Sequence, residues 1–369
     1  MYIECLNLDR FRNYKSLHID LSPGCNVFYG KNAQGKTNII EAIFLCAVGR
    51  SHRTSKDNEL VMIGESTYRV TLDVVKEDIK KSVSISYDMQ QGKRVDVNEI
   101  SLKRMVDLIG NLNAVIFSPE EIMMIKQGPF ERRRFTDITI SQIKPSYFRD
   151  LQRYSHLLKQ RNILLKDIQL GKSKGKELTV WNDTLASTGA RIIYERKEFI
   201  KRISNKIQEN HLKLTDGKES LTILYVPSFD IDDKMDITEI EKKFKRILEE
   251  TEPREIQRGM TLYGPQRDDF EFILDGISLK LYGSQGQQRT AILSVKISEI
   301  DIMFEETGEM PVLLLDDVMS ELDESRQKYL FENIGKIQTI ITCTDKEKFK
   351  NEENARIFFV SKGTVKIEE

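Results

Sequence analysis

The sequence predicts an α/β fold in which a unit built from both chain ends carries an inserted, mainly helical second lobe. Three observations predict it. Strand-like patterns gather near both ends of the 369-residue chain, a glycine-rich segment stands between an apolar strand and an apolar helix, and a long proline-free stretch with helical periodicity fills the middle. At roughly 100–200 residues per domain, this length suits two structural units.

The first third of the chain is expected to consist mainly of strands. Apolar and polar residues alternate over 2–8 and 17–21, and a short apolar run covers 25–29. The apolar segment 38–48 stops at Gly49, which is typical of a buried helix ended by a glycine. The other elements expected here are strands at 67–75, 82–88 and 113–117 and a short helix at 99–109.

The middle of the chain has the pattern of long helices. Helical periodicity at 147–169 and 177–213 flanks a short loop rich in lysine and glycine, as in a helical hairpin. The later elements expected are strands at 221–226, 269–274, 312–315 and 338–343 and helices at 237–250, from 285 and at 323–334. We therefore expect the composite unit at 1–144 and 253–369, and the helical lobe at 145–252.

The composition excludes several classes of protein. Hydrophobic residues at 39% and charged residues at 31% support a large core rather than a disordered chain. The apolar runs fall far short of the roughly 18 residues of a membrane span, and the start, MYIECLNLDRF, lacks the features of a signal peptide. Four cysteines without metal-site spacing complete the prediction of a reduced, cytoplasmic protein without a membrane partner. A net charge of -1 excludes a nucleic-acid binder that works by bulk charge.

The glycine-rich segment, GKNAQGKT at 30–37, fits the phosphate-binding pattern GxxxxGK[ST] in full. Its backbone N–H groups can curl around phosphates, and the following helix adds the positive end of its dipole. Lys36 is expected to reach the β- and γ-phosphates, and the Thr37 hydroxyl to ligate Mg²⁺. The alternative is an ordinary loop before a helix, but the flanking strand and helix favour a nucleotide site. The residues expected to bind it are Gly30, Lys31, Asn32, Ala33, Gln34, Gly35, Lys36 and Thr37.

A second candidate element is the apolar run 312–315, which ends in Asp316 and Asp317. Such a run predicts a strand buried on both faces of a parallel sheet, and ligands of these sheets lie beyond the carboxyl ends of the strands. Asp316 is the expected partner of the Mg²⁺ held by Thr37, and Asp317 could orient or deprotonate the attacking water. A solvated strand end is the alternative, and the phosphate-binding segment makes the metal site the better interpretation.

A third polar segment opens the helix expected from 285. Ser284 and Gln287 have the spacing of a capping box, so the simplest interpretation is a well-capped helix. A glycine-bearing helix N-terminus also suits a phosphate. Within one chain it would be a second anion site beside the first.

Together these segments resemble the Walker A, signature, Walker B and D-loop elements of ABC-type ATPase heads. The matching segments are GKNAQGKT at 30–37, SQGQQ at 284–288, VLLLDD at 312–317 and SELD at 320–323. Further segments resemble the RecF family of SMC-like bacterial DNA replication and repair proteins. They are NL and FRNY within 7–14, GRSHRT at 49–54, FSPEE at 117–121, RRRF and Asp within 132–137, GPQRDD at 264–269 and YGSQGQQRT at 282–290.

The resemblance implies an ABC-type P-loop ATPase head built from both chain ends, with ATP and Mg²⁺ as cofactors. It implies an ATP-dependent homodimer in which Ser284 and Gly286 of one subunit meet the γ-phosphate bound by Lys36 of the other. It further implies sequence-independent binding of double-stranded and gapped DNA, partnership with RecR and RecO, loading of RecA, and a part in the SOS response. The cofactor-binding residues that it adds are Arg12, Asn13, Ser284, Gln285, Gly286, Gln287, Gln288 and Asp323.

Two departures from the wider ABC pattern bear on hydrolysis. Asp317 stands where ABC heads usually carry glutamate, and its shorter side chain reaches less far toward water. Residues 343–345 read CTD where a switch histidine is expected, and Phe117-Ser118 occupies the place of the transporter glutamine. The resemblance therefore suggests a weak, DNA-dependent ATPase that acts as a switch. The alternatives are an ATPase subunit of a membrane transporter and a non-hydrolysing SMC-like accessory. The transporter subunit predicts a switch histidine and the transporter glutamine, and the sequence shows neither.

Clusters of lysine and arginine could contact DNA phosphates, which binds DNA without reading its sequence. For each cluster taken alone, a solvated face of a helix or loop is the better interpretation, and the sequence does not show which cluster contacts DNA. The clusters lie at 80–81, 93–94, 103–104, 132–134, 172–176, 201–202 and 242–246.

Overall fold

The computed structural model describes residues 1–320, 322–335, 337–349 and 355–368, in two compact units. The first unit combines Met1–Ile122 with Arg289–Glu369, and the second is Met123–Gln288. The prediction of a unit built from both chain ends, with a mainly helical insertion, is therefore confirmed. The unit limits do not coincide with the expected boundaries at 144/145 and 252/253, because segments on both sides of the long helices pack with them.

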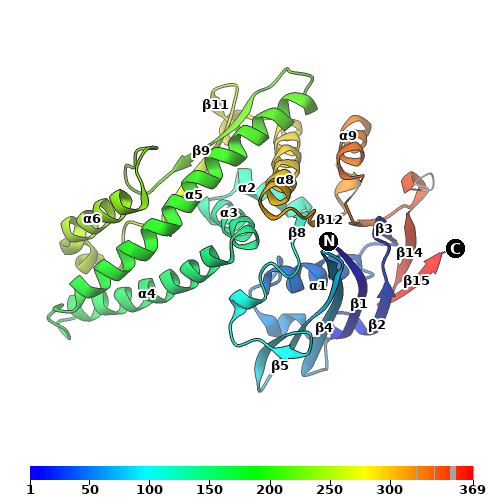
Figure 1. Ribbon diagram of the computed structural model, residues 1–369, viewed down its shortest axis with the longest axis horizontal. Coiled ribbons are helices and arrows are strands. Elements are labelled where there is room, and N and C mark those ends of the chain that lie inside the picture. The colour runs from blue at the N-terminus through cyan, green and yellow to red at the C-terminus, as the bar shows by residue number, and fades with distance from the viewer. Residues whose placement is uncertain (321, 336, 350–354, 369) are drawn as a thin grey trace. The chain divides into compact units, whose positions relative to one another are not determined.

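The first unit contains two six-stranded sheets (Figure 1). One is antiparallel with the strand order β2-β1-β4-β5-β6-β7, and the other has the order β15-β14-β3-β13-β12-β8 and is parallel except for β15. The antiparallel strands are β1 (Tyr2–Phe11), β2 (Tyr14–Asp20), β4 (Thr67–Lys76), β5 (Ile79–Asp88), β6 (Gly92–Val97) and β7 (Ile100–Ser101). The others are β3 (Cys25–Tyr29), β8 (Ala114–Phe117), β12 (Val312–Asp316), β13 (Thr339–Cys343), β14 (Arg356–Ser361) and β15 (Thr364–Glu368).

Helix α1 (Lys36–Val48) contacts strands of both sheets, so it is buried around most of its circumference. Its apolar sequence matches this position, and Gly49 ends it at a φ of 75°, as expected. Strands β8, β12 and β13 are buried along their whole length, which accounts for their continuous apolar runs. Helix α8 (Gln285–Thr307) precedes β12 and begins in the second unit, and helix α9 (Glu324–Ile334) lies between β12 and β13 in the sequence.

Two parts of the first unit differ from the sequence-based expectation. The expected helix at 99–109 is wrong: the segment forms β7 and a single 3₁₀ turn at Met105–Asp107. Asn98 and Glu99 adopt left-handed backbone conformations, which make a tight hairpin from β6 into β7. The β14–β15 hairpin near the end of the chain was not predicted.

The second unit consists of helices and one small sheet. Its helices are α2 (Met123–Lys126), α3 (Pro129–Ile143), α4 (Pro145–Gln169), α5 (Leu178–Leu214), α6 (Ile237–Arg258) and α7 (Leu279–Tyr282). The sheet has the order β11-β10-β9, from β9 (Leu221–Val226), β10 (Asp269–Leu274) and β11 (Ile277–Ser278). Helix α3 contacts α4, α5 and β10, and β10 pairs with β9, so both flanking segments belong to this unit. None of the helices described in either unit has a stretch apolar and long enough to span a membrane.

Helix α6 runs through Pro253 to Arg258, whereas the expected helix ended at 250. A buried ion pair explains the extension. Glu255, two residues after the proline, is fully buried and bonds the equally buried Arg161 at 2.6 Å. Arg161 also donates to Asn182 (2.8 Å) and Thr261 (2.7 Å), so α4, α5 and α6 meet at this side chain. Tertiary contacts therefore outweigh the helix-breaking tendency of proline, which is about 3 kcal/mol.

Candidate nucleotide site

The glycine-rich segment forms a loop from the end of β3 to the start of α1. Gly30 and Gly35 take φ values of 153° and 115°, and Ala33 is also left-handed. A Cβ atom on Gly30 would lie 2.3 Å from the carbonyl oxygen of Val360, so glycine is required there. This is the strand–loop–helix arrangement that the sequence predicted.

Lys36 points into this loop. Its ammonium donates to the carbonyl oxygens of Gly30 (2.6 Å) and Lys31 (2.9 Å). Burial lowers its pKa, while the nearby charges of Asp317 and Asp316 act in the opposite direction. A positively charged group therefore lies at the N-terminus of α1, an arrangement that suits a phosphate.

The predicted metal pair is brought together. The Thr37 hydroxyl donates to Oδ1 of Asp316 at 2.9 Å across 279 positions of sequence, and the Thr342 hydroxyl donates to the same oxygen at 2.6 Å. Burial raises the pKa of Asp316, and the two hydroxyl bonds oppose that shift. A hydroxyl beside a carboxylate is an oxygen donor set that suits Mg²⁺. Thr342 was not singled out from the sequence, although it lies near the end of the neighbouring strand β13.

Asp317 follows β12 in a left-handed conformation, with a φ of 53°. Its backbone N–H donates to the hydroxyl (3.0 Å) and the carbonyl oxygen (3.2 Å) of Thr342, so the sharp turn is held in place. Among the nearby charges that raise the pKa of Lys36, that of Asp317 has the largest effect. Both carboxylates therefore stand at the edge of the sheet that faces the loop.

Two neighbouring strand ends carry the residues expected at the places of the transporter glutamine and the switch histidine. Phe117 pairs with Leu315, so the buried Ser118 follows at the same sheet edge as Asp316. Cys343 is buried, which raises the pKa of its thiol to about 12, and its carbonyl oxygen accepts from the Gly30 N–H at 3.3 Å. Neither a serine hydroxyl nor a protonated thiol is a strong general base at neutral pH.

Arg12 and Asn13 lie in the turn between β1 and β2. Asn13 contacts the loop directly, since its side-chain N–H donates to the carbonyl oxygen of Gln34 at 2.9 Å. Arg12 instead bonds the carboxylate of Glu41 through two nitrogens, at 2.8 and 2.6 Å. The structure thus places the Asn13 side chain at the loop, whereas the Arg12 side chain contacts helix α1 through Glu41.

Glu41 is a residue of this site that the sequence analysis missed. It is fully buried, and Ser51 of the GRSHRT segment also bonds it, at 2.5 Å. Burial by itself raises the pKa of Glu41, but the bonds from Arg12 and Ser51 bring it below the ordinary value. A lone carboxylate within the apolar run NIIEAIFLCAV was the available signal, because such a charge needs a partner.

The expected capping box is present at the start of α8. The Ser284 N–H donates to the Gln287 side chain at 2.8 Å, and the Gln287 N–H donates to the Ser284 hydroxyl at 3.2 Å. Ser284, Gln285 and Gly286 are exposed, and Gln288 is buried against Gly283. These residues belong to the second unit, whereas the loop at 30–37 belongs to the first.

In the first unit, Asp323 caps helix α9 by accepting from the Arg326 N–H at 2.9 Å. This backbone bond is the main cause of its lowered pKa. Its neighbour Glu321, part of the SELD segment, lies outside the described residues. Asp323 is thus placed as a helix cap, and its expected role with nucleotide stays a prediction.

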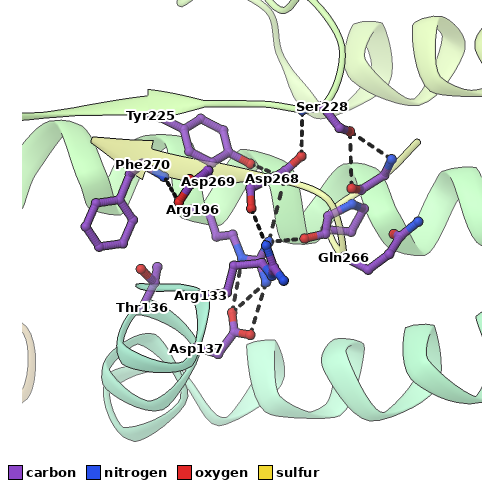
Figure 2. Close-up of polar contacts among 12 residues, drawn as sticks. Arg133, Thr136, Asp137, Arg196, Tyr225, Ser228, Gln266, Asp268, Asp269 and Phe270 are labelled. Carbon is purple, nitrogen blue, oxygen red and sulfur yellow. Dashed lines mark hydrogen bonds and ion pairs between the residues drawn. The ribbon is translucent and has the colours of Figure 1, made fainter. Parts of the chain in front are cut away.

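The RRRF and GPQRDD segments meet in a buried polar network of the second unit (Figure 2). Arg196 of α5 pairs with Asp137 of α3 at 2.9 Å and lies 3.6 Å from Asp268. Asp268 accepts from the Tyr225 hydroxyl and, at 2.8 Å, from the Ser228 N–H. Burial raises the pKa of Asp268. The network ties α3, α5 and β9 to the GPQRDD segment.

The basic clusters differ in their availability to DNA. Arg132 is buried and bonds both carboxylate oxygens of Asp269, at 2.6 and 2.8 Å, so it holds the fold rather than a phosphate. The lysines of the loop between α4 and α5 are exposed, at Lys172, Lys174 and Lys176.

Comparison with known proteins places these observations in a family. A model described as the RecF/RecN/SMC N terminal domain matches residues 2–366. Relatives described as DNA replication and repair protein RecF include one from Acetivibrio thermocellus, 54% identical over 95% of both chains, and one from Ruminiclostridium cellulolyticum, 47% identical over 99% of both. A solved structure of the recombination mediator protein RecF with ATP, in the RecFOR pathway, has a TM-score of 0.94 and 37% identity and covers 100% of this chain and 98% of that one. The Smc head bound to the C-winged helix domain of ScpA has a TM-score of 0.57 at 18% identity, covering 100% and 97%, and shares the fold. The predicted ABC-type head is thereby confirmed.

Proposed function

Because this chain belongs to the RecF family of DNA replication and repair proteins, we propose that it binds ATP at residues 30–37 and dimerises head to head on DNA. The observation that carries the proposal is the 2.9 Å bond from Thr37 to Asp316, which joins the phosphate-binding loop to the acidic strand end. The ATP-bound structure of a 37% identical relative supports the choice of nucleotide. Lys36 would hold the β- and γ-phosphates, and Thr37 with Asp316 would hold Mg²⁺, which would supply charge neutralisation.

Hydrolysis is proposed to be slow. With Asp316 at the metal, the adjacent Asp317 would orient the water, and its side chain is short. The residues next to it, Ser118 and Cys343, lack the proton affinity of the groups they replace. ATP would then act chiefly as a switch between monomer and dimer, and a turnover above roughly 10 s⁻¹, the median for enzymes, would contradict this.

Dimerisation is proposed to use the exposed start of α8. Ser284 and Gly286 of one subunit would meet the γ-phosphate held by Lys36 of the other, with Asp323 close to the shared nucleotide. Arg12 and Asn13 would contact the nucleotide within their own subunit. The exposure of Ser284, Gln285 and Gly286 supports this role, since the N-terminus of a helix that is exposed to solvent suits a partner's phosphate.

In the cell, we propose a cytoplasmic recombination mediator. It would bind double-stranded and gapped DNA without reading sequence, with the exposed lysines at 172–176 as candidate phosphate contacts. RecR and RecO are the proposed partners for loading RecA at gaps and for SOS induction, in line with the RecFOR pathway named for the related structure.

Sedimentation velocity with labelled duplex DNA tests this proposal. We expect ATP with Mg²⁺ to produce a dimer on DNA in the wild-type chain and in Lys15→Met, a matched control whose exposed side chain lies in β2, outside the loop. Lys36→Met should lose both ATP binding and the dimer. Ser284→Arg should keep ATP binding and lose the dimer. A wild-type chain that stays monomeric with ATP bound would refute the clamp, and a dimer without any phosphate release would favour the non-hydrolysing accessory.

A further inference from the structure

The turn of the last hairpin contacts the phosphate-binding loop from outside. This turn joins β14 to β15 through Lys362 and Gly363 (Figure 1). The Lys362 N–H donates to the side-chain oxygen of Gln34 at 2.8 Å, and the Gly363 N–H donates to the Gln34 carbonyl oxygen at 3.3 Å. The same carbonyl oxygen accepts from Asn13. Gln34 is therefore held by two turns that lie far apart in the sequence.

The turn fits closely against its neighbours. Lys362 and Gly363 both adopt left-handed conformations, at φ values of 47° and 71°, as a two-residue hairpin turn requires. A Cβ atom on Gly363 would lie 2.3 Å from the Asn13 carbonyl oxygen, which belongs to the backbone and cannot swing aside. Glycine at this position is therefore needed for contact as well as for conformation.

We propose that the Lys362–Gly363 turn is a positioning element that holds Gln34, and with it the loop at 30–37, in the conformation that receives ATP. The inference rests on the proposed function, since it concerns the same nucleotide. A loop whose N–H groups already converge binds a phosphate without first becoming ordered. When the turn is displaced, the competent conformation is populated less, and the apparent affinity falls by the same factor.

A second hairpin provides a matched control. Asp275 and Gly276, between β10 and β11, adopt φ values of 48° and 81°, nearly those of Lys362 and Gly363. A Cβ atom on Gly276 meets nothing within 4 Å. Gly363→Ala and Gly276→Ala therefore introduce the same backbone strain, and only the first also presses on Asn13.

The test measures binding of a fluorescent ATP analogue, with Mg²⁺, to the full chain and these variants, together with their thermal unfolding. We expect Gly363→Ala to weaken binding by about tenfold or more and Gly276→Ala by less than about twofold, because only the first reduces the competent population. Gln34→Leu provides a second variant, since it keeps the side-chain size and removes the acceptor of the Lys362 N–H. It should bind ATP more weakly and show faster hydrogen exchange at Lys362.

Equal affinities of the two folded glycine variants would overturn the inference while leaving ATP binding intact. If Gly363→Ala does not fold, Gln34→Leu decides: wild-type affinity together with faster exchange at Lys362 overturns it. A wild-type chain that fails to bind ATP overturns the proposed function, and this inference with it.

Discussion

Replacing Glu41 tests how the segments around the phosphate-binding loop are held together. Its buried carboxylate receives two bonds from Arg12 and one from Ser51, and Arg53 lies 3.5 Å away. It thereby joins the β1–β2 turn and the GRSHRT segment to the helix that begins in the phosphate-binding loop. Glu41→Gln keeps the shape and removes the charge, so the arginines lose their counterion.

The expected cost follows from burial. Removing one partner of a fully buried ion pair costs about 3–5 kcal/mol. Arg12 and Arg53 remain 21% and 42% exposed, so water can reach both guanidinium groups, and glutamine keeps one acceptor oxygen. We therefore expect a loss of about 2–3 kcal/mol in the free energy of unfolding of the first unit. Because the folded pKa of Glu41 lies below its ordinary value of 4.5, this stabilisation is complete above 4.5 and is lost as pH falls through the folded value.

The assay must report on the first unit. Trp181, the only tryptophan, lies in α5 of the second unit, so its fluorescence follows the wrong part of the chain. Hydrogen exchange of α1 peptides across a urea series is the suitable measurement. Glu59→Gln is the control, because Glu59 is a neighbouring carboxylate that is 46% exposed, so its replacement should change the stability far less than Glu41→Gln does. Equal effects of the two substitutions would refute the reasoning.

Three further predictions follow from buried charges. Arg161→Met should destabilise the second unit by about 3–5 kcal/mol, measured by urea unfolding with tryptophan fluorescence. Adding Glu255→Leu should recover much of that loss, and a double variant less stable than the single one would contradict the prediction. Lys296→Met should destabilise the first unit, because it leaves the carboxylate of Glu299 buried at 4% exposure, and α8 peptides should then exchange faster at neutral pH. As the proposed metal ligand, Asp316 would bind Mg²⁺ only when ionised, and its pKa is raised above 3.8, so the Mg²⁺ dependence of ATP binding should weaken on acidification. This dependence should be absent at every pH in Asp316→Asn, and unchanged Mg²⁺ dependence in that variant would remove Asp316 from the metal site.

Much of the fold was predictable because local patterns and tertiary structure agree. The strands at 25–29 and 221–226 were placed at their observed limits, since each is a short run of strand-forming residues bounded by turn signals. The pairing of Thr37 with Asp316 was also expected, because a phosphate-binding loop and an acidic strand end need each other at one sheet edge.

The remaining features depend on partners that the sequence does not mark. Pro253 predicted the end of a helix, and the buried contacts of Glu255 carry α6 beyond it. The β14–β15 hairpin was missed because its strands are short and partly exposed, so little alternation distinguishes them. Glu41 was missed because its partner Arg12 lies 29 positions earlier, and no sequence pattern links the two residues.

The strand order of the parallel sheet has a consequence for biosynthesis. Strand β3, which leads into the phosphate-binding loop, lies between β13 and β14, and these are made more than three hundred residues later. During translation, β3 is therefore made long before the strands that flank it, and the helical insertion is synthesised in between. In a polypeptide truncated before β13, Asp316 lacks the hydroxyl bond from Thr342, and its strand lacks the neighbour that separates it from β3. Under the proposed function, we therefore expect a chain truncated before β13 to lose the ATP-dependent switch as a whole rather than to keep part of it.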